Sequence, residues 1–184
     1  MPPSSAPRPV RVWLMDESRV GLLTALQRRL TLPGIAPLGR CQHERDNFYI
    51  YGATEVSTGA GYFAASCGLN ATAFQEFSDE LCALEPEALH LLLLDNSKTH
   101  QAQALRLPVN LRLIFLPPYS PELNPIERLW QHLKAQLGDH LFASLAALQD
   151  ALAALVEALE PPTIQALVAP TWLRTAIHNA KLSF

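Results

Sequence analysis

Five short stretches of the chain are apolar and rich in β-branched and aromatic residues. They cover residues 10–15, 47–54, 61–66, 90–94 and 111–116. Runs of this length and composition predict β-strands. Gly59 marks a turn between the second and third runs, which predicts a hairpin. The fourth run is continuously apolar, as expected for a strand that is buried on both faces of a sheet.

Between and after these runs, large apolar residues recur at helical spacing. Residues 70–84 form an amphipathic segment that Asn70 or Thr72 could cap. We expect a short helix over residues 99–105. A further helix rich in Ala and Leu is predicted over residues 144–159, ending at Pro161 and Pro162, and the tail holds an amphipathic stretch at 173–177.

A proline-rich turn after the fifth run leads into the most clearly marked helix. Asn124 and Pro125 form a typical helix start, with Asn as the cap and Pro as the first helical residue. This helix is predicted to run to residue 137 and to end at Gly138. Glu127 would then stand in its first turn.

The order of the predicted elements indicates the fold class. Three strands that can pair antiparallel are followed by alternating strands and helices, which predicts an α/β protein with a mixed five-stranded sheet and helices on both faces. Residues 17–45 contain several Gly and Pro and are expected to be loop-rich. Residues 1–9 are expected to be a linker or disordered arm, and residues 10–184 one domain with C-terminal helices from about residue 144.

The amino-acid composition limits the possible classes of protein further. Of the 184 residues, 49% are hydrophobic and 17% are charged, which is typical of a globular domain. No apolar run approaches the roughly 20 residues of a membrane helix, and the N-terminus has no apolar signal core. The three cysteines contain no close pair, so we expect free thiols in a reducing cytoplasm. The net charge of −3 is unusual for a chain that holds DNA unaided.

Three carboxylates stand out by position. Asp16 and Asp95 each follow a predicted strand, and strand ends are where ligands gather in open α/β sheets. Clustered carboxylates repel one another, and a divalent cation such as Mg²⁺ or Mn²⁺ removes that cost. Structural alternatives stay open on these residues alone. An Asp after a strand is often a turn residue, and Glu127 could complete a capping box with Asn124.

Three longer stretches carry a family resemblance. WLMDESRVGL (13–22), LLLLDNSKTHQA (91–102) and LIFLPPYSPELNPIERLWQHLK (113–134) resemble the signature blocks of the mariner-like transposase superfamily, and most of all its bacterial insertion-sequence members. The resemblance covers roughly residues 10–160. It implies a ribonuclease-H-like fold and a catalytic DDE site in which Asp16, Asp95 and Glu127 hold the metal, Mg²⁺ or Mn²⁺, as two ions. Glu17 and Glu122 look like non-ligands.

The resemblance also implies a function and partners. Such a domain cuts double-stranded DNA at transposon ends and joins the ends to target DNA. Family members carry an N-terminal helix-turn-helix module, so we expect that module to be separate or missing here, which accounts for the acidic charge. A homodimer is an open arrangement, no membrane is involved, and the expected location is the bacterial cytoplasm, on the nucleoid when DNA is bound.

Five further polar residues near the blocks are candidates for DNA contact, although a turn or a solvated helix face is the alternative for each. They are Asn96, Lys98, His100, Arg128 and Lys134. Trp130 is expected to be a core residue. Three other functions stay open: a catalytically silent transposase remnant that binds DNA or a partner, a simple ribonuclease-H-like nuclease, and a phosphatase that uses Asp95 as its nucleophile.

Overall fold

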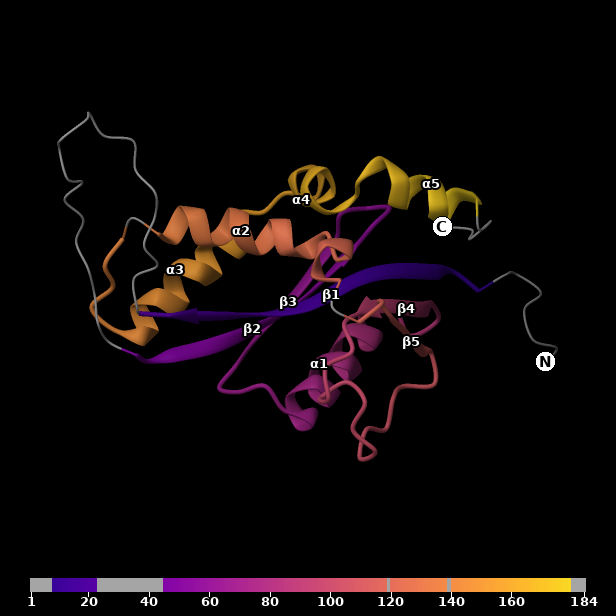
Figure 1. The fold of residues 1–184 in the computed structure, drawn as a ribbon, viewed down its shortest axis with the longest axis horizontal. Helices are drawn as coiled ribbons and strands as arrows, with labels where there is room; N and C mark the ends of the chain where they lie inside the picture. Colours follow the sequence, from indigo (N-terminus) through magenta and orange to yellow (C-terminus); the bar gives the residue numbers. More distant parts are fainter. Residues whose placement is uncertain (1–7, 23–44, 119, 139, 180–184) are drawn as a thin grey trace.

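The computed structural model describes residues 8–22, 45–118, 120–138 and 140–179. Their centre is one mixed five-stranded sheet with the order β3-β2-β1-β4-β5 (Figure 1). The strands are β1 (Val10–Gly21), β2 (Asn47–Glu55), β3 (Gly61–Ser66), β4 (Leu89–Leu94) and β5 (Leu111–Phe115). β1, β2 and β3 pair antiparallel, whereas β4 pairs parallel with both β1 and β5. The predicted mixed sheet is therefore confirmed.

β1 is longer than the sequence pattern predicts. The expectation that this strand ends before Asp16 is wrong, because its pairing with β2 continues through Asp16↔Gly52 to Gly21↔Asn47. Polar residues fit inside the strand because successive side chains point to opposite faces of the sheet. The first part of the predicted loop-rich segment is therefore strand. Residues 23–44 lie outside the described residues, as do residues 1–7 of the predicted arm.

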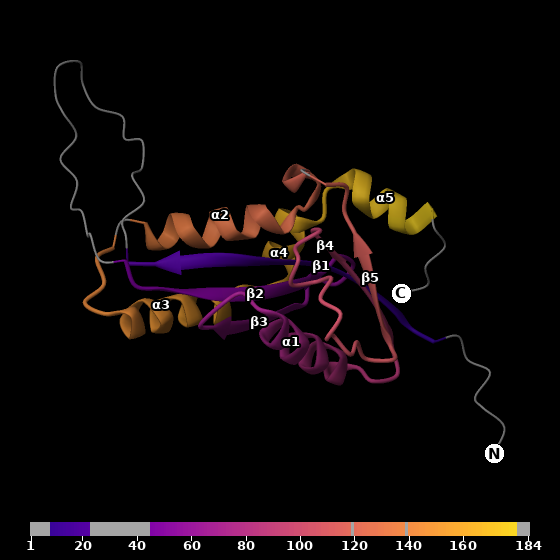
Figure 2. The ribbon, with the colours of Figure 1, turned by 60° about the horizontal axis from the view of Figure 1, so that its bottom comes forward.

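Helices cover both faces of the sheet, as Figures 1 and 2 show. One face carries α1 (Ala71–Leu84), whose N-terminus is capped by the Asn70 side chain, which accepts a 2.9 Å hydrogen bond from the Ala73 N–H. The other face carries four helices, which are α2 (Ile126–Leu137), α3 (Leu145–Glu157), α4 (Pro161–Val168) and α5 (Thr171–Asn179).

Three local predictions need correction. Residues 99–105 form turns and not a helix. Pro161 and Pro162 do follow α3, but they also begin α4, where the first helical turn needs no N–H donors. The N-cap of α2 is Pro125, not Asn124. The side chain of Asn124 instead accepts a 3.4 Å bond from the Ile126 N–H and donates to β1.

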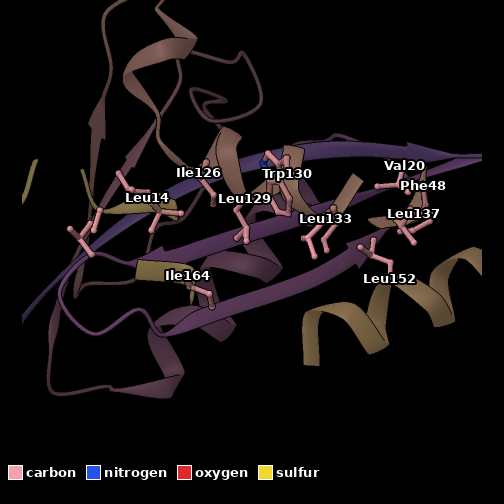
Figure 3. Close-up of a cluster of buried hydrophobic side chains, with 14 of the residues drawn as sticks. Leu14, Val20, Phe48, Ile126, Leu129, Trp130, Leu133, Leu137, Leu152 and Ile164 are labelled. Carbon is pink, nitrogen blue, oxygen red and sulfur yellow. The ribbon is translucent and has the colours of Figure 1, made fainter. Parts of the chain in front are cut away.

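The sheet divides the core into two parts. On one face, Leu14, Val20 and Phe48 pack against α2, whose apolar side chains point toward the strands (Figure 3). On the other face, Met15 and Tyr51 pack against α1. The alternation along β1 therefore assigns even-numbered residues to the α2 side and odd-numbered residues to the α1 side.

Within the described ranges, no single helix is long and apolar enough to cross a membrane; only α3 and α4 together reach that length and composition, as a pair bent by 94°.

Candidate active site

Asp16 and Asp95 lie on neighbouring strands. β1 and β4 run parallel, and the last residues in register are Leu14 and Leu93. Asp16 and Asp95 each come two residues later, so they follow the register to the same end of the strand pair. β1 and β4 are neighbours in the sheet. Asp95 stands just beyond the end of β4 with its side chain 58% exposed, whereas Asp16 remains within β1 and is half-buried.

Two hydrogen bonds tie the start of α2 to β1 beside Asp16. The Asn124 side-chain amide donates a 2.8 Å bond to the carbonyl oxygen of Met15, and the indole N–H of Trp130 donates a 3.1 Å bond to Oδ2 of Asp16. Glu127 lies between these two anchors in the chain and is half-buried. No hydrogen bond joins its carboxylate to the described helix start, so the capping-box alternative finds no support.

Asp16 is a partly buried carboxylate with two other carboxylates nearby. Burial in the fold, together with the negative charges of Glu127 and Glu17, raises the pKa of Asp16 to about 7. Hydrogen bonds from the Glu17 backbone and from Trp130 act in the opposite direction but do not offset the rise. Glu127 is thus near enough to Asp16 for its charge to disfavour the ionised form of Asp16.

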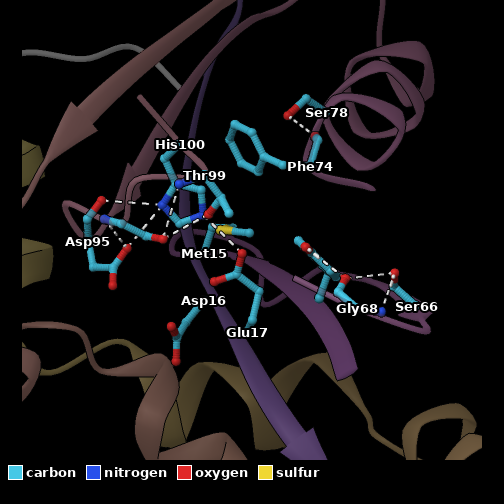
Figure 4. A network of polar contacts seen from close by, with 12 residues as sticks. Met15, Asp16, Glu17, Ser66, Gly68, Phe74, Ser78, Asp95, Thr99 and His100 are labelled. Atoms are coloured by element: carbon cyan, nitrogen blue, oxygen red, sulfur yellow. Dashed lines mark hydrogen bonds and ion pairs between the residues drawn. The ribbon is translucent and has the colours of Figure 1, made fainter. Parts of the chain in front are cut away.

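On the other face of β1, a buried histidine joins two acidic residues (Figure 4). The Nε2 atom of His100 lies 2.9 Å from Oε1 of Glu17, and its Nδ1 atom lies 3.0 Å from Oδ1 of Asp95. The ring also contacts Phe74, with 4.5 Å between the ring centroids. Burial opposes the charged imidazolium, but the bond and charge of Glu17 and the charge of Asp95 raise the pKa of His100 above its ordinary value.

Glu17 therefore points away from Asp16, as the strand alternation predicts, and Figure 4 shows the two carboxylates turned in different directions. No local pattern indicates that His100 pairs with Glu17, because 83 residues separate them in the chain. Trp130 is a core residue, as predicted, with 3% of its surface exposed. Its hydrogen bond to Asp16 went unpredicted.

The five DNA-contact candidates separate by exposure. Asn96, Lys98, Arg128 and Lys134 are exposed, and DNA contact by them stays a prediction. The Asn96 side chain donates to the carbonyl oxygen of Leu116. His100 is only 2% exposed and both ring nitrogens face carboxylates, so it is directed into the protein and not toward a DNA surface.

The carboxylate oxygens of this site are ligands that suit a hard divalent cation. The carboxylates are not grouped around one point in the described residues. Asp16, Asp95 and Glu127 offer anionic oxygens, which Mg²⁺ and Mn²⁺ prefer, and burial, together with the charges of Glu127 and Glu17, raises the pKa of Asp16. Among the described residues, no three His, Cys, Asp or Glu side chains stand close enough together to hold a metal ion as they are placed.

The comparison with protein families decides the class of this chain. Residues 11–149 match the family model described as DDE superfamily endonuclease. The chain belongs to the DDE superfamily endonucleases. The match takes in Asp16, Asp95 and Glu127 and most of the described fold, so these residues lie within a DDE endonuclease domain.

This DDE domain is similar to one curated protein in sequence and to several solved structures in fold. An uncharacterized protein, y4pE/y4sA, of Sinorhizobium fredii (strain NBRC 101917 / NGR234) is 38% identical over 89 residues, which are 47% of this chain and 64% of the relative. The Mos1 pre-cleavage transpososome superposes with a TM-score of 0.70 at 17% identity over 95% of this chain and 57% of the Mos1 chain.

A second Mos1 structure, the paired-end complex with the left transposon end, gives a TM-score of 0.68 at 18% identity over 86% of this chain and 51% of that chain. These superpositions confirm the ribonuclease-H-like fold. The DDE domain spans less than two thirds of the length of each of these relatives.

Proposed function

We propose that this DDE endonuclease domain is the catalytic part of a DNA transposase, which cuts double-stranded DNA at transposon ends and joins the ends to target DNA. The observation that carries the proposal is the placement of Asp16 inside β1, where Trp130 of the helix that carries Glu127 donates to it and where Asp95 follows the neighbouring strand. The structural relatives that support it are named as Mos1 transposase complexes with a transposon end and as a strand transfer complex.

Asp16, Asp95 and Glu127 are the residues that would hold the metal, as two Mg²⁺ or Mn²⁺ ions. Solved Mos1 paired-end complexes are described with Mg and with Mn, which supports the choice of cation. Two bound divalent ions would supply activation of the attacking oxygen and stabilisation of the leaving oxygen of the phosphodiester.

The protein's own residues then have separate tasks. Burial around Asp16 keeps bulk water from one of the ligands, which strengthens its interaction with any cation. His100 holds Oδ1 of Asp95 from inside the protein and thereby limits the orientations of that exposed carboxylate. Lys98 and Arg128 are exposed, and we propose that they contact phosphates of the DNA backbone, which positions a duplex without reading its sequence.

The acidic composition limits how DNA is captured. With a net charge of −3, the domain gains little from release of DNA counterions, so we propose that a helix-turn-helix module supplies recognition of the transposon ends. We also propose that the protein acts in the bacterial cytoplasm, on the nucleoid when bound to DNA. A homodimer would let two domains serve two ends.

The deciding experiment compares Glu127→Gln with the parent, with the domain joined to an end-binding module so that substrate capture is not limiting. An amide is a poor ligand for a hard cation, whereas Gln serves a helix start nearly as well as Glu. We expect Glu127→Gln to abolish Mg²⁺-dependent cleavage with little change in melting temperature.

Glu122→Gln is the matched control, because Glu122 is an exposed carboxylate in the 3₁₀ turn before α2, and it should cut at the parental rate. Cleavage by Glu127→Gln at the parental rate would remove Glu127 from the ligand set. A parent that holds Mg²⁺ and DNA but cuts nothing would instead identify a catalytically silent remnant.

A further inference from the structure

We propose that Trp130 is a positioning residue, whose indole N–H fixes the carboxylate of Asp16 for divalent metal binding, and that Gly52 supplies the space that makes this contact possible. The inference rests on the proposed function of the site, since it takes Asp16 to be a metal ligand. It gives Trp130 a second role, because the apolar pattern of α2 by itself predicts only that Trp130 is a core residue.

The first observation is the hydrogen bond itself. Nε1 of Trp130 lies 3.1 Å from Oδ2 of Asp16. The indole has one polar hydrogen, and Trp130 directs it to this carboxylate from a side chain that is 3% exposed. The contact engages one of the two carboxylate oxygens. Since Trp130 follows Glu127 by three positions on α2, both residues lie on neighbouring parts of one helix face.

The second observation is that the fold holds the indole by shape. Gly52 on β2 is the residue in register with Asp16 on β1. A Cβ atom at Gly52 would come within 2.4 Å of Cη2 and 2.9 Å of Cζ2 of Trp130, so only glycine leaves room for the ring in this position. On another side, Phe63 packs edge-on against the indole, with 6.2 Å between centroids and an angle of 75° between the planes.

These contacts restrict the indole, and the indole in turn restricts Asp16. A core position that needed only apolar volume would be served by Phe or Leu, and no buried donor would then require a partner. Hydrogen-bond partners of metal-ligating carboxylates orient the ligand, and their loss typically lowers metal affinity or activity about 10- to 100-fold. We therefore expect an effect on metal binding beyond any effect on packing.

The chain contains a matched control. Trp13 is also buried, at 5% exposure, and its Nε1 also donates a hydrogen bond, of 3.0 Å, but to Nδ1 of His90. Trp13→Phe and Trp130→Phe thus remove the same donor from equally buried rings, and only Trp130 touches a candidate ligand.

The test measures Mn²⁺ affinity of the whole chain by electron paramagnetic resonance, with circular dichroism to verify folding. We expect Trp130→Phe to weaken Mn²⁺ binding about 10- to 100-fold, while Trp13→Phe stays within about threefold of the parent. Equal Mn²⁺ affinity of Trp130→Phe and the parent would overturn the inference and leave the proposed function standing. A parent that binds no Mn²⁺ would overturn both.

A second measurement needs no core variant. In ¹H–¹⁵N spectra of the parent, Mg²⁺ should shift the indole signal of Trp130 and leave those of Trp13 and the exposed Trp172 in place. Trp13→Phe and Trp172→Phe assign the signals by removing one each. An unmoved Trp130 signal at Mg²⁺ saturation would also overturn the inference, even if Trp130→Phe failed to fold.

Discussion

His100 and Glu17 are 83 positions apart in the chain, yet Nε2 of the first lies 2.9 Å from Oε1 of the second, with side-chain exposures of 1% and 8%. The pair joins the turn after β4 to the middle of β1. Because His100 also contacts Asp95, the buried pair connects the α1 side of the sheet to a candidate ligand.

Removing either partner of this pair should destabilise the domain. His100→Ala and Glu17→Ala should each cost about 3 kcal/mol in the free energy of unfolding, since each leaves a buried polar group unpaired. The double variant should cost less than the sum, with a coupling energy of about 1–3 kcal/mol. Urea denaturation of the parent, the two single variants and the double variant measures this coupling energy.

The surface pair Arg11–Glu85 provides the comparison for that cycle. Its atoms are also 2.9 Å apart, but the side chains are 25% and 47% exposed. An exposed pair of this kind should couple by less than about 1 kcal/mol. Equal coupling in the two cycles would mean that burial adds nothing to the His100–Glu17 contact.

Asp16 should make the metal-free domain less stable as the pH rises. Its pKa in the folded protein is about 7, above the ordinary value of 3.8, so the folded state binds the proton more tightly than the unfolded state. The associated stability is fully present below about pH 4 and is lost as the pH rises through about 7. Asp16→Asn carries no charge at any pH and should escape this loss.

We therefore expect Asp16→Asn to be more stable than the parent at pH 8 in a chelator, by at least about 1 kcal/mol, and to show no such gain near pH 4. Denaturant titrations at the two pH values measure the difference. Asp150→Asn, at an exposed position on α3, should show no gain at either pH. A pH-independent gain for Asp16→Asn would trace the effect to packing and not to charge.

Two cysteines should differ sharply in reactivity. Burial and the nearby charge of Asp79 raise the pKa of the Cys82 thiol to about 11, whereas Cys67 is exposed. Since the thiolate is the reactive form, iodoacetamide at pH 8 should label Cys67 within minutes and leave Cys82 unlabelled until the protein unfolds. Mass spectrometry of the peptides locates the label. Rapid labelling of Cys82 in the native protein would show that α1 opens readily.

Gly59 should tolerate no side chain. Its φ of +76° lies in the region that favours glycine, and a Cβ atom there would come within 2.1 Å of the carbonyl oxygen of Pro161. Gly59→Ala should lower stability by more than about 1 kcal/mol, because the hairpin turn packs on α4. Thermal unfolding measures the loss. At Gly68 the nearest atom is 3.7 Å from such a Cβ, so Gly68→Ala should change stability little.

Local sequence patterns predicted most of the strands and helices of the described residues. Apolar runs located all five strands, and helical spacing located α1, α2 and α3, because both signals depend on residues that are close in the chain. The three signature blocks led to the DDE family, and the strands that carry Asp16 and Asp95 are indeed neighbours. Whether these two residues and Glu127 hold metal remains a prediction.

Contacts between distant segments were decided only by the tertiary structure. β1 continues past Asp16 because β2 supplies hydrogen-bond partners, which no local pattern in β1 reveals. Within the turns at residues 99–105, His100 contacts two carboxylates that are distant in the chain or lie outside this segment, Glu17 of β1 and Asp95 just after β4. The contact of Trp130 with Asp16 needs a glycine on a third element, 78 residues before Trp130 in the chain. Such contacts depend on how the faces of the sheet and the helices pack together. The sequence pattern within one element does not specify which distant element packs against it.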